Sequence, residues 1–197
     1  MFFKQMLICL FLCLSLFSQA AMAIEEPKFD VIEKVEAFEL RAYKPLIVAE
    51  VLVDGDMKQA SSKGFKLIAD YIFGNNKSKA GAKIGDIEKI SMTAPVAMQK
   101  DASKWRVNFV MPSQYRLETL PTPNNPQVNL HEAAAKKFAV VRFSGLVGEE
   151  KMASKTAELQ AWMQTKQIAP IATPELARYN PPWTLPFLRR NEILIEY

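Results

Sequence analysis

The sequence predicts an α+β fold in which a duplicated β-β-α-β-β unit forms a distorted antiparallel β-barrel flanked by two long α-helices. With 49% hydrophobic and 23% charged residues, the composition is typical of a globular protein. A strand, a glycine-containing turn and a long helix follow one another twice along the chain. Neither half has enough apolar faces to close a core alone, and the connections are too short for repeated parallel crossovers, so we expect both halves to share one antiparallel layer.

The first 23 residues have the layout of a secretory signal peptide. Lys4 is the only charged residue there, an apolar run covers residues 6–17, and Ala21 and Ala23 are the small residues that flank a cleavage point after Ala23. The run is shorter than the roughly 20 residues that cross a bilayer, which makes a retained anchor the weaker interpretation. We expect a signal peptide over 1–23, one domain over 24–197 with no further membrane span, and export to the periplasm or secretion.

Both cysteines, Cys9 and Cys13, lie in this leader. The exported domain is therefore expected to have no disulfide, no cysteine nucleophile and no cysteine-based metal site. The 25 Lys and Arg residues and the 21 Asp and Glu residues are interspersed without a basic stripe, so we expect no nucleic-acid partner. The mild positive balance is compatible with an anionic small ligand, although a solvated surface is the simpler explanation.

The first pseudo-repeat, residues 28–112, contains a helix between two strands. Apolar residues alternate over 47–53 and again over 105–111, which predicts the strands. An aspartate can cap the helix that we expect over 57–73, and a glycine can end it in a left-handed conformation. The residues at three- and four-residue steps, which share one helix face, are Met57, Ala60, Ser61, Gly64, Phe65, Ile68, Tyr71 and Ile72.

The second pseudo-repeat, residues 126–197, has the same order of elements. A strand over 138–143 and a turn over 144–148 precede a helix that begins at Glu149, where acidic residues suit the helix dipole. Alternation over 191–197 predicts the final strand. The expected buried residues of this half are Met152, Thr156, Leu159, Met163, Ile193, Ile195 and Tyr197.

Motifs for catalysis are absent from the sequence. The one histidine, His131, has no Gly-x-Ser-x-Gly motif to present a serine to it, and it cannot form a histidine-based zinc site alone. Neither a Walker motif nor Gly-x-Gly-x-x-Gly is present. We therefore predict that the protein is not an enzyme, with a small-molecule hydrolase as the weaker alternative. His131 is more simply a surface or structural residue than a ligand.

Two segments have unusual local chemistry. In residues 90–98, Pro95 predicts a kinked strand, and Met92 offers a polarizable sulfur, although core packing explains that methionine more simply. In residues 179–192, three prolines stiffen the backbone, and Trp183 supplies flat apolar area. A structural lock and the rim of a ligand site explain this second segment equally well.

Arg189 and Arg190 are expected to play different roles. If both lie on the last strand, alternation places Arg189 on the inward side and Arg190 outward beside Glu192. An unpaired buried charge is costly, so Arg189 would be paired or would face a cleft. Arg190 and Glu192 would then form a weak surface pair.

Several motifs, taken in order, resemble those of the SOUL haem-binding protein family. They are Phe38-Glu39-Leu40-Arg41-x-Tyr43, Tyr71-x-x-Gly74, Met92-Thr93-Ala94-Pro95-Val96, Phe143-Ser144-Gly145, Tyr179-Asn180-x-Pro182 and Arg189-Arg190-Asn191-Glu192. The resemblance covers the chain from about residue 29 to its end, and it implies a distorted antiparallel barrel flanked by two helices. It also implies that a tetrapyrrole binds in an apolar cleft beside the first helix, under the loop before the final strand.

A haem site needs an apolar cleft, a cation for the propionates and, optionally, an axial ligand. The residues proposed for the cleft and its cation are Phe65, Ile68, Tyr71, Ile72, Met92, Trp183 and Arg189. Met92 and His131 are weak candidates for an axial ligand to iron. We expect a binding protein for haem or a related tetrapyrrole, and the alternative is a module that binds another amphipathic small molecule or a protein partner. The sequence does not specify an oligomeric state.

Overall fold

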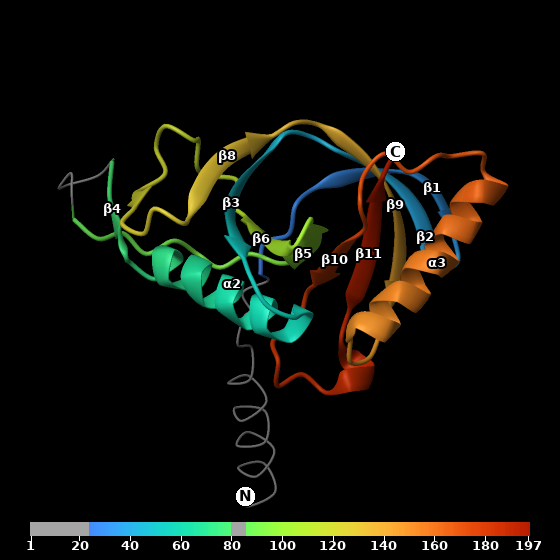
Figure 1. Ribbon diagram of the computed structural model, residues 1–197. Coiled ribbons are helices and arrows are strands. Elements are labelled where there is room, and N and C mark those ends of the chain that lie inside the picture. The colour runs from blue at the N-terminus through green and yellow to red at the C-terminus, as the bar shows by residue number, and fades with distance from the viewer. Residues whose placement is uncertain (1–23, 80–85) are drawn as a thin grey trace, which may run out of the picture.

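A computed structural model of the protein describes residues 24–79 and 86–197 (Figure 1). The predicted signal peptide over 1–23 lies outside the described residues. The described part has an α+β fold, in which a curled nine-stranded antiparallel sheet is accompanied by two helices. The strand order is β1-β2-β9-β11-β10-β5-β6-β3-β8, and a second sheet pairs β4 with β7.

The elements have the following bounds. The strands of the large sheet are β1 (Phe29–Val35), β2 (Phe38–Tyr43), β3 (Leu46–Val53), β5 (Val96–Asp101), β6 (Lys104–Val110), β8 (Asn129–Ala133), β9 (Lys136–Phe143), β10 (Glu175–Arg178) and β11 (Asn191–Glu196). The small sheet consists of β4 (Asn76–Lys77) and β7 (Thr122–Pro123), and the helices are α2 (Met57–Ile72), α3 (Glu149–Thr165) and the short 3-10 helix η1 (Pro186–Leu188).

The sheet is an open half-barrel, whereas the sequence predicts a barrel. Among the described residues, β1 pairs only with β2 and β8 pairs only with β3, so the two end strands do not close on each other. Apolar alternation shows which strands have a buried face, but it contains no information about closure. The order β2-β9-β11-β10 on one side of the sheet mirrors β8-β3-β6-β5 on the other. The duplication itself stays a prediction.

Helix α2 confirms the predicted helix, and its ends follow the expected chemistry. The side chain of Asp56 accepts a hydrogen bond from the Gln59 backbone N–H at 2.8 Å, and Gln59 Oε1 accepts one from the Asp56 N–H at 3.3 Å, forming a capping box. Gly74 has a φ of 124°, a left-handed conformation that a glycine adopts without strain after the helix end. The helix therefore begins and ends close to where the sequence predicts.

The two helices pack on different strands. Helix α2 lies on β3 and β6, whereas α3 lies on β9 and β11, so the central strands β5 and β10 run between them. Figure 1 shows α2 and α3 on opposite sides of these central strands. The larger core cluster joins both helices to one face of the sheet, and a smaller cluster around Val140, Ala177 and Leu194 lies on the other face.

Helix α3 matches the prediction in position and in its buried face. It begins at Glu149 and buries Leu159 and Met163 completely, while Met152 and Thr156 are partly buried. Within the described ranges, neither helix is long and apolar enough to span a bilayer.

Candidate ligand-binding groove

Two hollows of about 390 Å³ each border α3, one between the starts of α2 and α3 and the other between α3 and the strands β5 and β6. We name them the arginine pocket and the tryptophan pocket after Arg178 and Trp105. The arginine pocket is lined by Asp56, Met57, Lys58, Ser61, Ser62, Val147, Gly148, Glu149 and Arg178. The tryptophan pocket is lined by Lys100, Trp105, Glu149, Met152, Ala153, Thr156, Ala157 and Gln160. Because Glu149 lines both, the two hollows are neighbours.

Arg178 is a half-buried cation with uncharged partners. It ends the central strand β10, where it pairs in register with Val96 of β5. Its Nη1 donates to Ser61 Oγ at 2.7 Å and its Nη2 to the Val147 carbonyl at 3.5 Å. In the part of the chain that the structure describes, no carboxylate lies within ion-pair distance of it. Burial lowers the pKa of Arg178, and the nearby Arg189 charge lowers it further.

The two carboxylates of the arginine pocket accept hydrogen bonds from backbone N–H groups at the start of α2. Asp56 caps the helix through the Gln59 N–H, and Glu149 Oε1 accepts a hydrogen bond from the Met57 N–H at 3.4 Å. Gly148, the N-cap of α3, provides no side-chain acceptor for the first turn of that helix. The pocket therefore combines a guanidinium that has no carboxylate partner among the described residues, two serine hydroxyls and a helix start, beside two carboxylates that already accept backbone hydrogen bonds. The unpaired guanidinium favours an anionic group.

The loop between β10 and β11 is strongly apolar at its surface. Trp183 is 82% exposed and Phe187 is 70% exposed. Leu185 and Leu188 in the same loop, and Leu146 in the neighbouring loop, are also exposed. Such a cluster of exposed large apolar side chains marks a binding surface more often than isolated exposed residues do.

The backbone of this loop is held by hydrogen bonds. The Gly145 N–H donates to the Pro186 carbonyl at 2.9 Å, which joins the loop to the segment that leads to the arginine pocket. Arg189 Nε donates to the Thr184 carbonyl at 2.8 Å, and its Nη2 donates to the Pro182 carbonyl. The apolar side chains are thus presented from a braced loop, as a structural lock requires, and its role as the rim of a ligand site stays a prediction.

The expectation for Arg189 and Arg190 is wrong in its geometry. Both residues precede β11, and Arg189 follows the short helix η1, so strand alternation does not apply to them. Glu192 is 1% exposed and lies inside the fold, and Arg190 is partly buried against it with Nε at 3.6 Å from Glu192 Oε1. Arg190 also stacks on the Tyr179 ring at 3.4 Å and pairs with Glu26 at 2.5 Å. Arg189 braces the loop instead of facing inward.

The main partner of Glu192 is Arg41. Arg41 Nη1 and Nη2 donate to the two Glu192 oxygens at 2.7 and 3.1 Å, and the Tyr179 hydroxyl donates to Glu192 Oε2 at 2.7 Å. Burial and the Glu192 carboxylate raise the pKa of Tyr179. Three of the sequence motifs therefore meet in one buried network, which links β2, β11 and the residue that follows β10.

The predicted cleft residues on α2 differ in accessibility. Ile68, Tyr71 and Ile72 are almost completely buried in the main core, and the Tyr71 hydroxyl donates to the Pro121 carbonyl at 2.9 Å. Phe65 is partly exposed, and its ring lies 5.8 Å from that of Phe109. The helical spacing correctly places these residues on one face, but most of that face packs against the sheet.

The remaining predicted site residues lie apart from one another. Met92 is partly buried against the main core. His131 lies on the end strand β8, where it pairs with Val48 and its Nδ1 is 3.5 Å from Asn129 Nδ2. Within the described residues, no group of three or more His, Cys, Asp or Glu side chains could hold a metal ion. Trp183 and Arg189 share the exposed loop, and a ligand role for any of these residues stays a prediction.

The sequence did not predict that Arg178 contacts Ser61 and Val147. The signal available was an arginine that ends the short apolar run Leu176-Ala177, directly before the proline-rich segment. Nothing in the periodicity indicated that this strand is central or that α2 brings Ser61 to its end.

Comparison with known proteins agrees with the fold and its motifs. A family model described as SOUL heme-binding protein matches residues 24–196, and no curated protein sequence matches the chain significantly. The crystal structure of the EcmrR C-terminal domain is similar with a TM-score of 0.61 and 10% identity, over 81% of this chain and 95% of that chain. A hydrolase from Listeria innocua is similar with a TM-score of 0.55 and 11% identity, over 83% of this chain and 93% of that chain. At such identities the solved structures share a fold only, but the family match spans most of the sequence, and the protein belongs to the SOUL heme-binding protein family.

Proposed function

We propose that this protein is an exported binder of haem or a related tetrapyrrole, and that the arginine pocket receives an acidic side chain of the ligand. The observation that carries the proposal is Arg178, whose guanidinium borders a hollow of about 390 Å³ and has no carboxylate partner among the described residues. A propionate there would provide the missing counter-charge. The family match supports a tetrapyrrole as the ligand.

The surroundings of Arg178 fit the rest of such a ligand. The exposed side chains of Trp183, Leu185, Phe187 and Leu188 offer flat and flexible apolar area on the adjoining loop, and Leu146 extends it. Ser61 and Ser62 supply hydroxyls in the pocket. A macrocycle with an apolar ring and acidic substituents can use both kinds of surface at once.

The pocket offers little to the iron of a haem. Its lining contains no imidazole and no thiolate, and its one thioether, Met57, is buried. When bound, haem would supply its own redox and ligand chemistry, while this chain would contribute Arg178, the serine hydroxyls and apolar contacts. We therefore propose that affinity comes from the carboxylates and the ring, with axial coordination as a minor contribution.

The proposal is tested by titrating the protein lacking residues 1–23 with hemin and following the Soret band. We expect saturation by one hemin per chain, and we expect Arg178→Gln to weaken binding by about 10-fold or more because a charge-assisted hydrogen bond is lost. Arg142→Gln is the matched control, since Arg142 is an exposed arginine of β9 outside the pocket. Equal affinities of Arg178→Gln and Arg142→Gln, or unsaturable binding by the parent protein, would overturn the proposal.

Export is proposed from the leader-like segment over 1–23. Its test is the intact mass of the protein recovered from the envelope of an expressing cell. We expect a chain that begins at Ile24, and a full-length chain found only in the cytoplasm would contradict it.

A further inference from the structure

Exposed apolar side chains gather on two adjacent loops at one end of the molecule. The Gly145 N–H donates to the Pro186 carbonyl at 2.9 Å, which joins the loop before α3 to the loop before β11. Figure 1 shows the loop before β11, with η1, at the lower end of the molecule beside the start of α3. Large apolar side chains clustered in this way mark an interaction surface. We name this surface the apolar cap, and its members, which are 55–82% exposed, are Leu146, Trp183, Leu185, Phe187 and Leu188.

The side chains of the apolar cap line neither the arginine pocket nor the tryptophan pocket. The backbone beneath them is held by hydrogen bonds from Arg189 to the carbonyls of Thr184 and Pro182, so they are presented together. A protein partner requires a surface of complementary shape, whereas a bilayer accepts protruding apolar side chains of any shape. Tryptophan in particular suits the boundary between lipid headgroups and acyl chains.

The loops that contain the apolar cap are positively charged. Residues 143–148 and 179–191 include Arg189 and Arg190 and no acidic residue. Arg190 pairs with Glu26, whereas no carboxylate lies within 4.0 Å of Arg189 among the described residues. An unpaired guanidinium beside exposed apolar side chains suits the phosphates of lipid headgroups.

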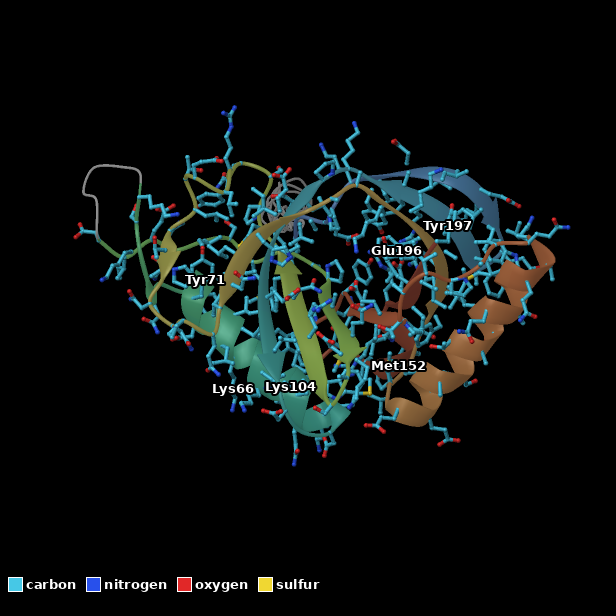
Figure 2. All side chains as sticks on the ribbon, turned by 45° about the horizontal axis from the view of Figure 1, so that its top comes forward. Lys66, Tyr71, Lys104, Met152, Glu196 and Tyr197 are labelled. Carbon is cyan, nitrogen blue, oxygen red and sulfur yellow. The ribbon has the colours of Figure 1, made fainter. Side chains whose placement is uncertain are left out.

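The two ends of β11 differ in polarity. The strand begins directly after the loop of the apolar cap, and Figure 2 shows Glu196 and Tyr197 at its other end, where Glu196 pairs with Lys136 at 2.7 Å. Glu149 and Glu150, which follow the loop before α3, belong to the first turn of that helix, where the helix dipole offsets their charge. The end with the apolar cap is therefore the one that suits contact with an anionic membrane.

We propose that the apolar cap docks this protein on the surface of an anionic phospholipid bilayer. Trp183 and Phe187 enter the boundary between headgroups and acyl chains, and Arg189 pairs with lipid phosphates. A second copy of the chain suits the cap less well, because a two-fold contact would bring the same unpaired arginines together. The proposed tetrapyrrole contacts the same loop, but this inference does not depend on that ligand, and its test contains none.

The test mixes the protein lacking residues 1–23 with sucrose-loaded vesicles of phosphatidylcholine that contain about 30% phosphatidylglycerol. We expect the protein to sediment with the vesicles, and its tryptophan emission to shift to shorter wavelength and to be quenched by bromine on the acyl chains. Trp183→Phe is expected to bind but to lose the emission shift, which assigns that signal to Trp183. Vesicles of phosphatidylcholine alone are expected to bind about five-fold more weakly, because their surface has no net negative charge.

Matched variants separate the apolar cap from other exposed apolar side chains. Phe187→Ser/Leu188→Ser is expected to weaken vesicle binding at least about 10-fold, because two large apolar side chains no longer enter the bilayer. The control is Ile87→Ser/Ile171→Ser, which replaces isoleucines that are 70% and 69% exposed outside the cap. We expect this control to bind as the parent protein does.

Arg189 is tested separately, because it both braces the loop and carries the charge. Arg189→Gln is expected to weaken binding to the anionic vesicles about five-fold, and Arg189→Lys, which keeps the charge, is expected to bind as the parent protein does. Absence of vesicle binding, equal losses in Arg189→Lys and Arg189→Gln, or an equal loss in the Ile87/Ile171 control would overturn the proposal, whatever the outcome with hemin. A lipid-free dimer that Phe187→Ser/Leu188→Ser abolishes would also overturn it, by assigning the cap to a second copy.

Discussion

Arg41 and Arg178 show two uses of an arginine withdrawn from solvent. Arg41 is buried and faces the Glu192 carboxylate through two hydrogen bonds, whereas Arg178 meets only a hydroxyl and a carbonyl. A buried ion pair is costly to form, and breaking it by removing one partner is costlier still. The first arginine is therefore structural, and the second retains its capacity to bind an anion.

Arg41→Met is expected to destabilise the protein by about 3–5 kcal/mol, because it leaves Glu192 charged and buried. The double variant Arg41→Met/Glu192→Leu is expected to lose clearly less stability than the sum of the losses in the two single variants. Urea unfolding gives each free energy. Additive losses would show that the two residues do not act as a pair.

Glu175 supplies a pH-dependent contribution to stability. Burial raises its pKa, although the Asn108 hydrogen bond and the charges of Lys136 and Arg106 oppose this. Below the ordinary carboxyl pKa both the folded and unfolded chains are protonated there, and as the pH rises the unfolded chain ionises first, so stability falls. We expect Glu175→Gln to raise the free energy of unfolding at pH 7 and to leave it nearly unchanged at pH 4. Urea unfolding at both pH values measures this, and a loss of stability at pH 7 would contradict it.

At the scale of elements, the sequence predicts what periodicity and capping control. The approximate bounds of α2 and the buried face of α3 follow from spacing, whereas the sequence allowed either Asp54 or Asp56 as the cap and the structure has Asp56. The short strand β10 escapes prediction because four residues contain too little alternation. The error for Arg190 has a different cause. A correct prediction would have required knowing that β11 begins at Asn191 and is buried on both faces.

Helix α2 approaches β6 closely at Gly64. A Cβ at this position would lie 2.6 Å from the Val107 Cβ and Cγ2 atoms. Alanine is the better helix former by about 1 kcal/mol, but here the contact would push the helix from the strand. The close approach is what lets α2 carry Ser61 to the end of β10.

Gly64→Ala is accordingly expected to destabilise the protein by about 1–3 kcal/mol, as overpacking usually does. The double variant Gly64→Ala/Val107→Ala is expected to lose less stability than the sum of the losses in the two single variants, because the smaller side chain at position 107 removes the clash. Thermal unfolding followed by circular dichroism compares the four proteins. An increase in stability for Gly64→Ala would show that propensity outweighs packing at this site.

At the scale of the whole molecule, the five tyrosines are a measure of native packing. Burial raises the pKa of every one of them, Tyr43, Tyr71, Tyr115, Tyr179 and Tyr197, and nearby carboxylates add to the effect at several. Below pH 10 the tyrosines are protonated in both the folded and the unfolded chain, so they do not make the free energy of unfolding depend on pH. Above pH 10 the unfolded chain ionises first, so stability falls as the pH rises.

We therefore expect the phenolate absorbance at 295 nm to rise only well above pH 10 in the native protein, and near pH 10 in 8 M urea. The free energy of unfolding is expected to decrease from pH 9 to pH 11. A native titration centred at pH 10 would contradict the burial of these side chains.

The site was harder to predict than the fold because it is assembled across the whole chain. Arg178, Ser61 and Val147 come from β10, α2 and the segment before α3, and only the sheet order brings them together. The sequence did identify Trp183 and its loop as chemically unusual, and Trp183 is exposed there, but its role at the rim of a ligand site stays a prediction. It could not show that Ile68, Tyr71 and Ile72 face the core, because a cleft-lining face and a core face have the same periodicity.

We propose that the protein recognises the carboxylates of its ligand more than the iron. The most direct measurement compares protoporphyrin IX, its dimethyl ester and hemin with the same protein by tryptophan fluorescence quenching. We predict that the dissociation constants of protoporphyrin IX and hemin agree within about 3-fold. The dimethyl ester is expected to bind at least about 10-fold more weakly than the free acid, because it cannot pair with Arg178. A dimethyl ester that binds as tightly as the free acid would contradict this account.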